Sequence, residues 1–414
     1  MRLSLLTLLL LSVPWTGVRA QLLDSLRAEL RRSNPELRAL TLDYRAALSV
    51  GVQQSQLPDL EVGLGVFVLP VETRTGPQQF RLGATQMLPW PGKLAAMAAV
   101  ADARARPLLE RVAARQLALR YRLDRAYYRL AGLRARATVL RESLELYTSL
   151  EQLTLRRVEV GSGSSVDVYR IQLQRQQTQR KINELANLAQ REMTTINELL
   201  DRPADTQIDP GIDLSERVAE ILEFAPDLAA DDPDLADHPA LRYYQLQAEA
   251  NRAAIELNDL DGRPDFGVGL DYIATGRRTD ADPPRNGRDV LLPRATVRLP
   301  LNRTKYAAKR QEEELRIEAL SARSEATEAT FRADLRNALL IIDNAANELN
   351  FLGEQARIVG ATLAIARGEF ANGRRPFDEL LRLENQLIDY RTRAVVARTT
   401  ILRERATLDR YLLQ

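Results

Sequence analysis

The residues best placed to do chemistry are two carboxylates, Asp167 and Glu379, each six residues after a glycine, Gly161 or Gly373. Both would lie in the first turn of a helix, where a negative charge stabilises the positive end of the helix dipole. The glycines are expected to end one helix, and a serine or proline to start the next, in the turns Val160-Gly161-Ser162-Gly163-Ser164 and Asn372-Gly373-Arg374-Arg375-Pro376.

The sequence contains no set of residues typical of an enzyme. Its only histidine, His238, stands beside Pro239 at a predicted helix start, where a structural role is expected. Cysteine is absent, which excludes thiol chemistry, disulfides and a structural His/Cys zinc site. The glycine-rich segment 161–165 follows a helix instead of a strand, which indicates a tight turn and not a phosphate loop. We therefore expect no enzyme activity, no cofactor and no metal site.

The charge is high but balanced, with 58 basic and 56 acidic residues and a net charge of +2. This balance argues against a nucleic-acid partner, because proteins that bind nucleic acids usually carry a clear excess of basic residues. Residues 1–20 have a basic start, an apolar run and small residues before Ala20, and they are expected to be a signal peptide cleaved after Ala20. Beyond it no apolar run reaches the length of a transmembrane helix, so any membrane-spanning part must be built from strands.

An internal duplication organises the rest of the chain. Four short motifs recur in the same order, at an offset that grows from about 204 to about 212 residues. They predict a first repeat over 21–200 and a second repeat over 236–414. Between them, residues 201–235 are expected to form an interrepeat (equatorial) linker with a short helix near 214–224. The recurring pairs are Asn34-Pro35-Glu36-Leu37 with His238-Pro239-Ala240-Leu241, Pro58-Asp59 with Pro264-Asp265, Leu88-Pro89 with Leu299-Pro300, and Gly161 with Gly373.

Each repeat contains a predicted β-hairpin, at about 59–89 and 265–300. Apolar and polar or glycine residues alternate in both, as in Leu60, Val62 and Leu64 against Glu61 and Gly63. The strands are about 9–11 residues long, enough to cross a bilayer at the tilt of a barrel. A soluble hairpin packed on helices is the alternative.

The remaining segments predict helices. First helices are expected at 22–56 and 236–260, long helices at 93–158 and 304–371, and returning helices at 166–200 and 377–413. The first long segment repeats apolar residues every 3.5 positions, which predicts coiled-coil packing, and Pro107 is expected to bend it. The predicted seams are Leu109, Val112, Gln116, Leu119, Leu123, Ala126, Leu130, Leu133, Ala137, Leu140, Leu144 and Tyr147, then Leu335, Leu339, Ile342, Ala346 and Leu349.

This order of elements resembles the TolC-like outer-membrane efflux protein family (outer membrane factors). A signal peptide is followed by a helix, a hairpin, a long helix, a tight turn and a returning helix, and this series is present twice. The segments Asn34–Leu37 and Gln86–Leu94 and the Gly-x5-Asp/Glu turns are similar to its motifs. The resemblance implies a mostly α fold with a small β part. Three protomers would each contribute four transmembrane strands to a trimeric 12-stranded β-barrel, and their two-fold repeated coiled-coil helices would form a periplasmic α-tunnel.

The resemblance also implies a site at the helical tips, where the family's tunnel narrows. Asp167 and Glu379 match carboxylates that line the closed periplasmic aperture, and three-fold repetition would make each a ring that attracts cations. Arg375 matches an arginine that helps to close the aperture by polar links. Gly163 replaces an arginine in the first repeat, and Arg382 stands where the family can carry a second acidic residue.

The function implied is an outer-membrane channel of a tripartite efflux or type I secretion system. Its partners would be two sister chains, outer-membrane lipid, a periplasmic membrane fusion (adaptor) protein and an inner-membrane transporter such as an RND-type pump. It would lie in the outer membrane with a long periplasmic extension. The alternative is a periplasmic coiled-coil adaptor or scaffold without channel activity. The sequence does not indicate whether the cargo is a drug, a metal ion or a protein.

Overall fold

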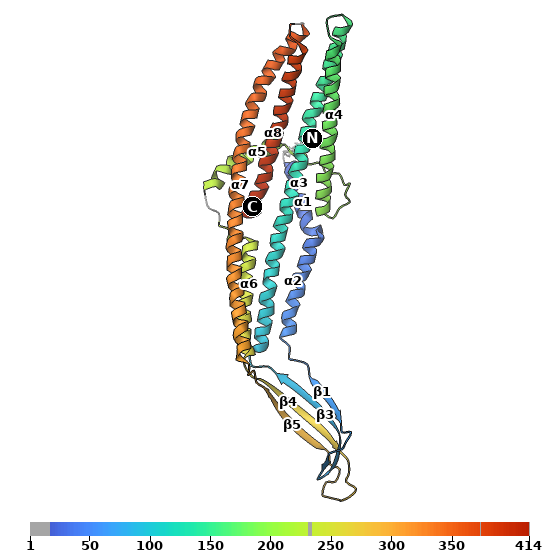
Figure 1. Ribbon diagram of the computed structural model, residues 1–414, viewed down its shortest axis with the longest axis vertical. Coiled ribbons are helices and arrows are strands. Elements are labelled where there is room, and N and C mark those ends of the chain that lie inside the picture. The colour runs from blue at the N-terminus through green and yellow to red at the C-terminus, as the bar shows by residue number, and fades with distance from the viewer. Residues whose placement is uncertain (1–16, 231–233, 373, 414) are drawn as a thin grey trace, which may run out of the picture. The chain divides into compact units, whose positions relative to one another are not determined.

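The computed structural model describes residues 17–230, 234–372 and 374–413, and it is mostly helical with one small sheet (Figure 1). This confirms the predicted fold class. No helix in the described ranges is both long and apolar enough to cross a membrane. The elements are α1 (Gly17–Ser33), α2 (Pro35–Gln54), β1 (Glu61–Val66), β2 (Glu72–Thr73), β3 (Gly76–Leu88), α3 (Lys93–Glu159), α4 (Ser165–Leu199), α5 (Leu214–Ala230), α6 (Pro239–Asp261), β4 (Asp265–Thr275), β5 (Val290–Arg298), α7 (Arg303–Ala371) and α8 (Phe377–Leu412).

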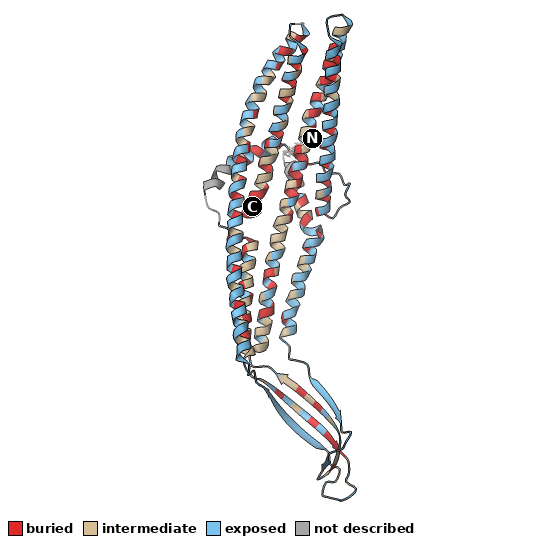
Figure 2. Ribbon diagram, in the orientation of Figure 1, coloured by how far each residue is buried: buried red, intermediate tan, exposed pale blue. Residues whose placement is uncertain are grey.

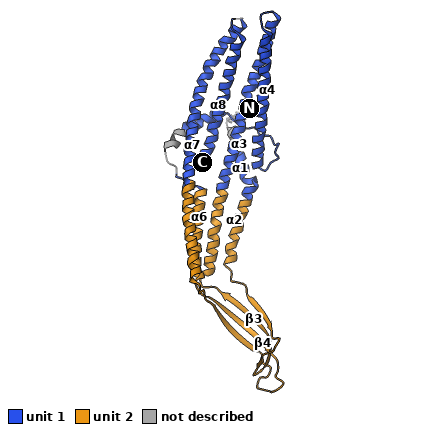
Figure 3. Cartoon of the chain, viewed as in Figure 1, with its two compact units in different colours: residues 1–38, 114–238, 328–414 blue, residues 39–113, 239–327 orange. Residues whose placement is uncertain are grey.

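The chain divides into two compact units that cut across the two sequence repeats (Figure 3). Unit 1 holds residues 1–38, 114–238 and 328–414, and unit 2 holds residues 39–113 and 239–327. Each unit therefore takes segments from both repeats, and α3 and α7 contribute to both units. The predicted signal peptide lies mostly outside the described residues.

Unit 2 contains an antiparallel sheet with the strand order β1-β3-β4-β5. The two predicted hairpins are β1 with β3 and β4 with β5, and they join edge to edge through β3 and β4. The register places Leu64 beside Leu82, Leu82 beside Tyr272, and Tyr272 beside Leu291. Both outer strands, β1 and β5, are exposed along their whole length (Figure 2).

The two faces of this sheet differ in chemistry. One face carries apolar side chains that are between 36% and 71% exposed, namely Val62, Leu64, Val66, Phe80, Leu82, Phe266, Val268, Leu270, Tyr272, Leu291 and Val297. The other face has Asp271 at its centre, fully buried between Arg81 and Arg294. Gly83 leaves room for this carboxylate, because a Cβ atom there would lie 2.2 Å from Asp271 Oδ1. Arg294 also donates to Thr85 Oγ1 at 2.6 Å.

The single helix predicted over 22–56 is wrong, since the structure has two helices divided at Asn34. Pro35 has no backbone N–H, and it is tolerated as the first residue of a new helix. The Asn34 side chain caps that helix, accepting from the backbone N–H groups of Glu36 at 3.0 Å and Leu37 at 3.1 Å. Its amide also donates to the Leu199 carbonyl at 2.9 Å, which ties the break to the end of α4.

The heptad seam of α3 is largely buried, with Leu119, Leu123, Leu130 and Tyr147 at 1% exposure or less. Leu109 is the exception at 49% exposure. In α7 Leu335 and Ile342 of the predicted seam are buried, but Ala338, Ala345 and Leu352 are buried in place of Leu339, Ala346 and Leu349. Ala338 and Ala345, and not Leu339 and Ala346, take the close-packed positions. The helix expected near 214–224 continues to Ala230 in α5.

Candidate functional site

The first candidate turn connects α3 to α4 in unit 1. Gly161 has φ +72, the left-handed conformation that glycine adopts without strain, and Ser162 N–H donates back to the Arg157 carbonyl at 2.8 Å. Gly163 is needed for space, because a Cβ atom there would lie 2.9 Å from Arg157 Cβ. Ser164 is the N-cap of α4, and its hydroxyl accepts from Val166 N–H at 3.2 Å. Asp167 lies in the first turn of α4.

The second candidate turn connects α7 to α8, also in unit 1. Pro376 is the N-cap of α8 and contributes no side-chain hydrogen bond. Gly373 lies outside the described residues. The turn closes through Arg374 N–H, which donates to the Glu369 carbonyl at 2.9 Å, and through the Asn372 amide, which donates to the Gly368 carbonyl at 3.0 Å.

Two of the predicted site residues, Arg375 and Glu379, form an ion pair at this second turn. Arg375 Nε lies 2.6 Å from Glu369 Oε2, and a second guanidinium nitrogen contacts Glu379 Oε1. The hydrogen bond with Glu369, followed by the charges of both glutamates, raises the pKa of Arg375. The negative charge of Glu379 is thus largely compensated within its own chain.

The other predicted carboxylate, Asp167, has a different partner. Arg170, one turn along α4, lies 3.7 Å from Asp167 and 2.5 Å from Asp378 of α8. Asp167 and Arg375 line one cavity of about 500 Å³ between the turns, and Gly163 lines it too. Glu379 and Gly161 are not part of its lining.

Sequence reasoning missed Arg157, the residue that ties the two turns together. Its guanidinium donates to the Phe370 carbonyl at 2.7 Å and to the Ser162 carbonyl at 3.2 Å, and it lies 4.6 Å from the Phe370 ring. No sequence signal marks this contact, since the partners are far apart in the chain. Arg170 could have been found, because its spacing of three residues from Asp167 is that of a helical ion pair.

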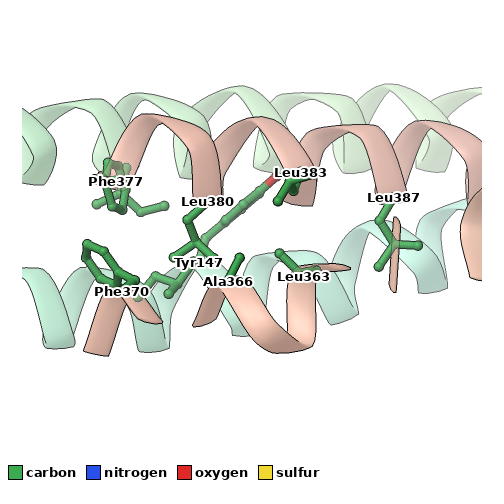
Figure 4. Close-up of a cluster of buried hydrophobic side chains, with 10 residues drawn as sticks. Tyr147, Leu363, Ala366, Phe370, Phe377, Leu380, Leu383 and Leu387 are labelled. Atoms are coloured by element: carbon green, nitrogen blue, oxygen red, sulfur yellow. The ribbon is translucent and has the colours of Figure 1, made fainter. Parts of the chain in front are cut away.

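A compact apolar core supports the turns (Figure 4). It contains Tyr147, Leu150, Ile171, Leu363, Ala366, Phe370, Phe377, Leu380, Leu383 and Leu387. The Tyr147 hydroxyl donates to Asn385 Oδ1 at 2.7 Å, and burial raises the pKa of this tyrosine. Helices α3, α4, α7 and α8 all contribute, so the two turns share one support.

The structure places His238 in a packed position within unit 1. The side chain is 4% exposed, and its ring centroid lies 4.6 Å from that of Phe331. Burial lowers the pKa of His238, which favours the neutral ring. In the part of the chain that the structure describes, no group of His, Cys, Asp and Glu is arranged to hold a metal ion.

Comparison with known proteins gives matches by sequence and by fold. Residues 26–201 match the model of the outer membrane efflux protein family. The structure is similar to the outer-membrane channel OprN, with 18% identity, a TM-score of 0.73 and coverage of 94% of this chain and 89% of that one. It is similar to VceC of Vibrio cholerae, with 16% identity, a TM-score of 0.71 and coverage of 95% and 96%. It is also similar to the open state of the MtrE channel of Neisseria gonorrhoeae, with 16% identity, a TM-score of 0.72 and coverage of 94% of this chain and 88% of that one. No curated protein sequence matches significantly.

These findings agree with the family predicted from the sequence: residues 26–201 match the outer membrane efflux protein family, and the chain shares the fold of solved outer-membrane channels. The sequence match covers the first repeat, and the similarity in fold covers 94% of the chain. The description of the matched family names the outer membrane, which agrees with the predicted localisation.

Proposed function

We propose that three copies of this chain form a passive efflux duct through the outer membrane. The observation that carries the proposal is the sheet of unit 2, which has an exposed apolar face, a polar centre around Asp271 on the other face, and two outer strands with one strand partner each. Lipid can surround an apolar face, but it cannot form hydrogen bonds with the unpaired backbone N–H and C=O groups of an open strand edge. Closure with the sheets of two sister chains into a 12-stranded barrel satisfies both edges.

Integration into the membrane is tested by placing a charge on either face of the sheet. Leu270→Arg puts a guanidinium on the apolar face, where a charge near the bilayer midplane costs about 2–4 kcal/mol. Thr296→Arg puts the same group on the opposite face and is the matched control. We expect only Leu270→Arg to lose the detergent-stable trimer and the sedimentation with outer membranes. A wild-type protein released in soluble form by osmotic shock would support the scaffold alternative instead.

The helical turns around Arg375 are proposed as the periplasmic aperture, closed at rest and opened when an adaptor protein engages them. The adaptor would link the duct to an inner-membrane pump such as an RND-type transporter. The ion pairs of Arg375 with Glu369 and Glu379 support the proposal, because they hold the second turn in one conformation. Asp167 stands beside this link in the same cavity.

Conductance of single channels in planar bilayers tests the aperture. Arg375→Ala frees Glu369 and Glu379, so we expect a larger conductance and a stronger preference for cations. Arg374→Ala is the matched control, since the side chain of Arg374 forms no ion pair with the residues described. Equal conductance for Arg375→Ala and wild type would place the closing contact elsewhere.

A further inference from the structure

Unit 1 carries a band of arginines that the aperture does not use. Three of them, Arg129, Arg136 and Arg403, line a cavity of about 230 Å³ where α3 meets α4 and α8. A second cavity, of about 550 Å³, continues along α3 and shares Arg129, Leu188 and Glu192 with the first. We call the full set the arginine strip: Arg122, Arg125, Arg129, Arg136, Arg191 and Arg403.

The charge of the arginine strip is not balanced locally. Arg122 and Arg129 lie 3.6 Å from Glu198 and 3.7 Å from Glu192, which are long distances for ion pairs. The charge of Glu404 acts on Arg403, and this carboxylate also accepts from Thr407 Oγ1 at 3.1 Å. Six guanidinium groups against these three carboxylates leave the strip of each chain with a net charge of +3. Three copies would carry +9.

Two guanidinium groups of the strip have polar atoms that are buried without a partner. Nε of Arg136 and Nε of Arg403 are shielded from solvent, and neither has a hydrogen-bond acceptor among the described residues. Burial, and then the positive charges of Arg125 and Arg129, lower the pKa of Arg403. A buried donor left without an acceptor is costly, so this cavity is suited to an acceptor that the chain itself does not supply.

The packing of the helices explains why the arginines converge. Gly132 of α3 lies directly against Thr399 of α8, since a Cβ atom on Gly132 would come 2.2 Å from Thr399 Oγ1. This close approach brings Arg403 to the same cavity as Arg129 and Arg136. Arg125 is held separately, by contact with the Tyr121 hydroxyl and with its ring, 5.2 Å away.

The strip lies where α3 meets α4 and α8, and it remains open to solvent at Arg122 and Arg129, whose side chains are 46% and 47% exposed. On the opposite side, about half a helical turn away, Asp124 binds Arg27 of α1 and Tyr127 donates to the Pro210 carbonyl at 2.6 Å. Arg134 on that side lies 2.7 Å from Asp209. Arg122 and Arg129 are therefore accessible to solutes, as the lining of a duct must be, whereas Asp124, Tyr127 and Arg134 are engaged by other parts of the chain.

We propose that the arginine strip lines the lumen of the duct and gives it a binding site for anionic cargo, meaning small molecules that carry carboxylate, phosphate or sulfate groups. Guanidinium groups donate paired hydrogen bonds to such oxyanions, and rings of them favour anions in pores. The inference rests on the proposed function, and it adds a cargo class that the acidic residues of the aperture do not predict.

Ion selectivity in planar bilayers tests the strip. The double variant Arg136→Gln/Arg403→Gln removes two positive charges, and Arg136→Lys/Arg403→Lys keeps them. In a KCl gradient near 0.1 M, we expect the Gln variant to lower the chloride-to-potassium permeability ratio by at least about threefold, because one unit charge about 6 Å from an ion in water already changes the local concentration of that ion by this factor. The Lys variant should remain close to wild type. At 1 M salt, where the Debye length is about 3 Å, the difference should vanish.

Arg134→Gln is the matched control, because it removes a charge from the opposite side of the same helix. Inorganic pyrophosphate serves as a probe that needs no variant: added at millimolar concentration, it should block the wild-type current more than spermine does. An unchanged permeability ratio in the Gln variant, or equal block by the two probes, would overturn the inference while leaving a working channel. Silent bilayers with every protein would instead refute the proposed function.

Discussion

The two helical turns of unit 1 occupy equivalent places in the two repeats, yet they are held by different forces. The α3–α4 turn depends on backbone geometry, with Gly161 at φ +72 and a hydroxyl cap from Ser164. The α7–α8 turn has no side-chain cap and depends on the Arg375 ion pairs and on Phe370 and Phe377. A duplicated hairpin can therefore keep its path while its charged contacts diverge. In the second turn, the ion pairs of Arg375 are the charged contacts that could be released.

The largest effect is expected from the aromatic support of the second turn. Phe377 is 3% exposed, and its ring centroid lies 5.7 Å from that of Phe370. Phe377→Ala should lower the free energy of unfolding by about 3–5 kcal/mol. Val166→Ala, at an exposed position of the first turn, should change it by less than about 0.5 kcal/mol. Denaturant unfolding monitored by circular dichroism measures both, and similar losses would show that the turns are supported equally.

An intermediate effect is expected from the contact between the turns. Arg157→Ala removes the hydrogen bonds to the Phe370 and Ser162 carbonyls, and should cost about 1–3 kcal/mol, the range for hydrogen bonds of charged groups. The neighbouring Arg156 is exposed, so Arg156→Ala is the control. Unfolding midpoints that are the same for both variants would mean that the turns hold their positions independently.

The smallest effect is expected in the pH dependence of stability. Burial raises the pKa of Glu384, near the second turn, although Arg367 donates to it at 2.8 Å and acts in the opposite direction. The folded state then binds this proton more tightly than the unfolded chain, so stability falls as pH rises from the ordinary glutamate pKa through the raised one. Glu384→Gln should therefore gain stability relative to wild type as pH increases.

The first repeat offers a control for that titration, since Gln172 stands 212 residues before Glu384, the same offset as between Asp167 and Glu379. Gln172 does not titrate itself, although its amide donates to Glu151 Oε1 at 2.8 Å, so the stability difference between Gln172→Ala and wild type should change less between about pH 4 and pH 7 than that of Glu384→Gln. Thermal melts across this range compare the two variants. A flat difference for Glu384→Gln as well would contradict the raised pKa.

Much of the fold could be predicted because its causes are local. The alternation in Val62–Val66 and the 3.5-residue repeat of α3 depend on neighbours along the chain, and the strands and helices lie close to their predicted bounds. Part of the α7 seam was misplaced because Leu339 and its neighbour Ala338 are both apolar, so the pattern alone does not decide which of them is buried. The division into two helices at Asn34 was not predicted, because the residues on both sides of it have a strong helical pattern that hides the helix cap formed by its side chain.

The sequence by itself determined where the chain turns, which residues could carry charge there, and that the hairpins alternate, since these depend on backbone conformation and periodicity over a few residues. Only the tertiary structure decided which charges are compensated. Arg375 meets Glu369 and Glu379, Arg170 meets Asp378, and Arg136 and Arg403 share a cavity without an acceptor. Electrostatic pairing depends on distance in space, and packing of helices brings together residues as much as 267 positions apart, as for Arg136 and Arg403.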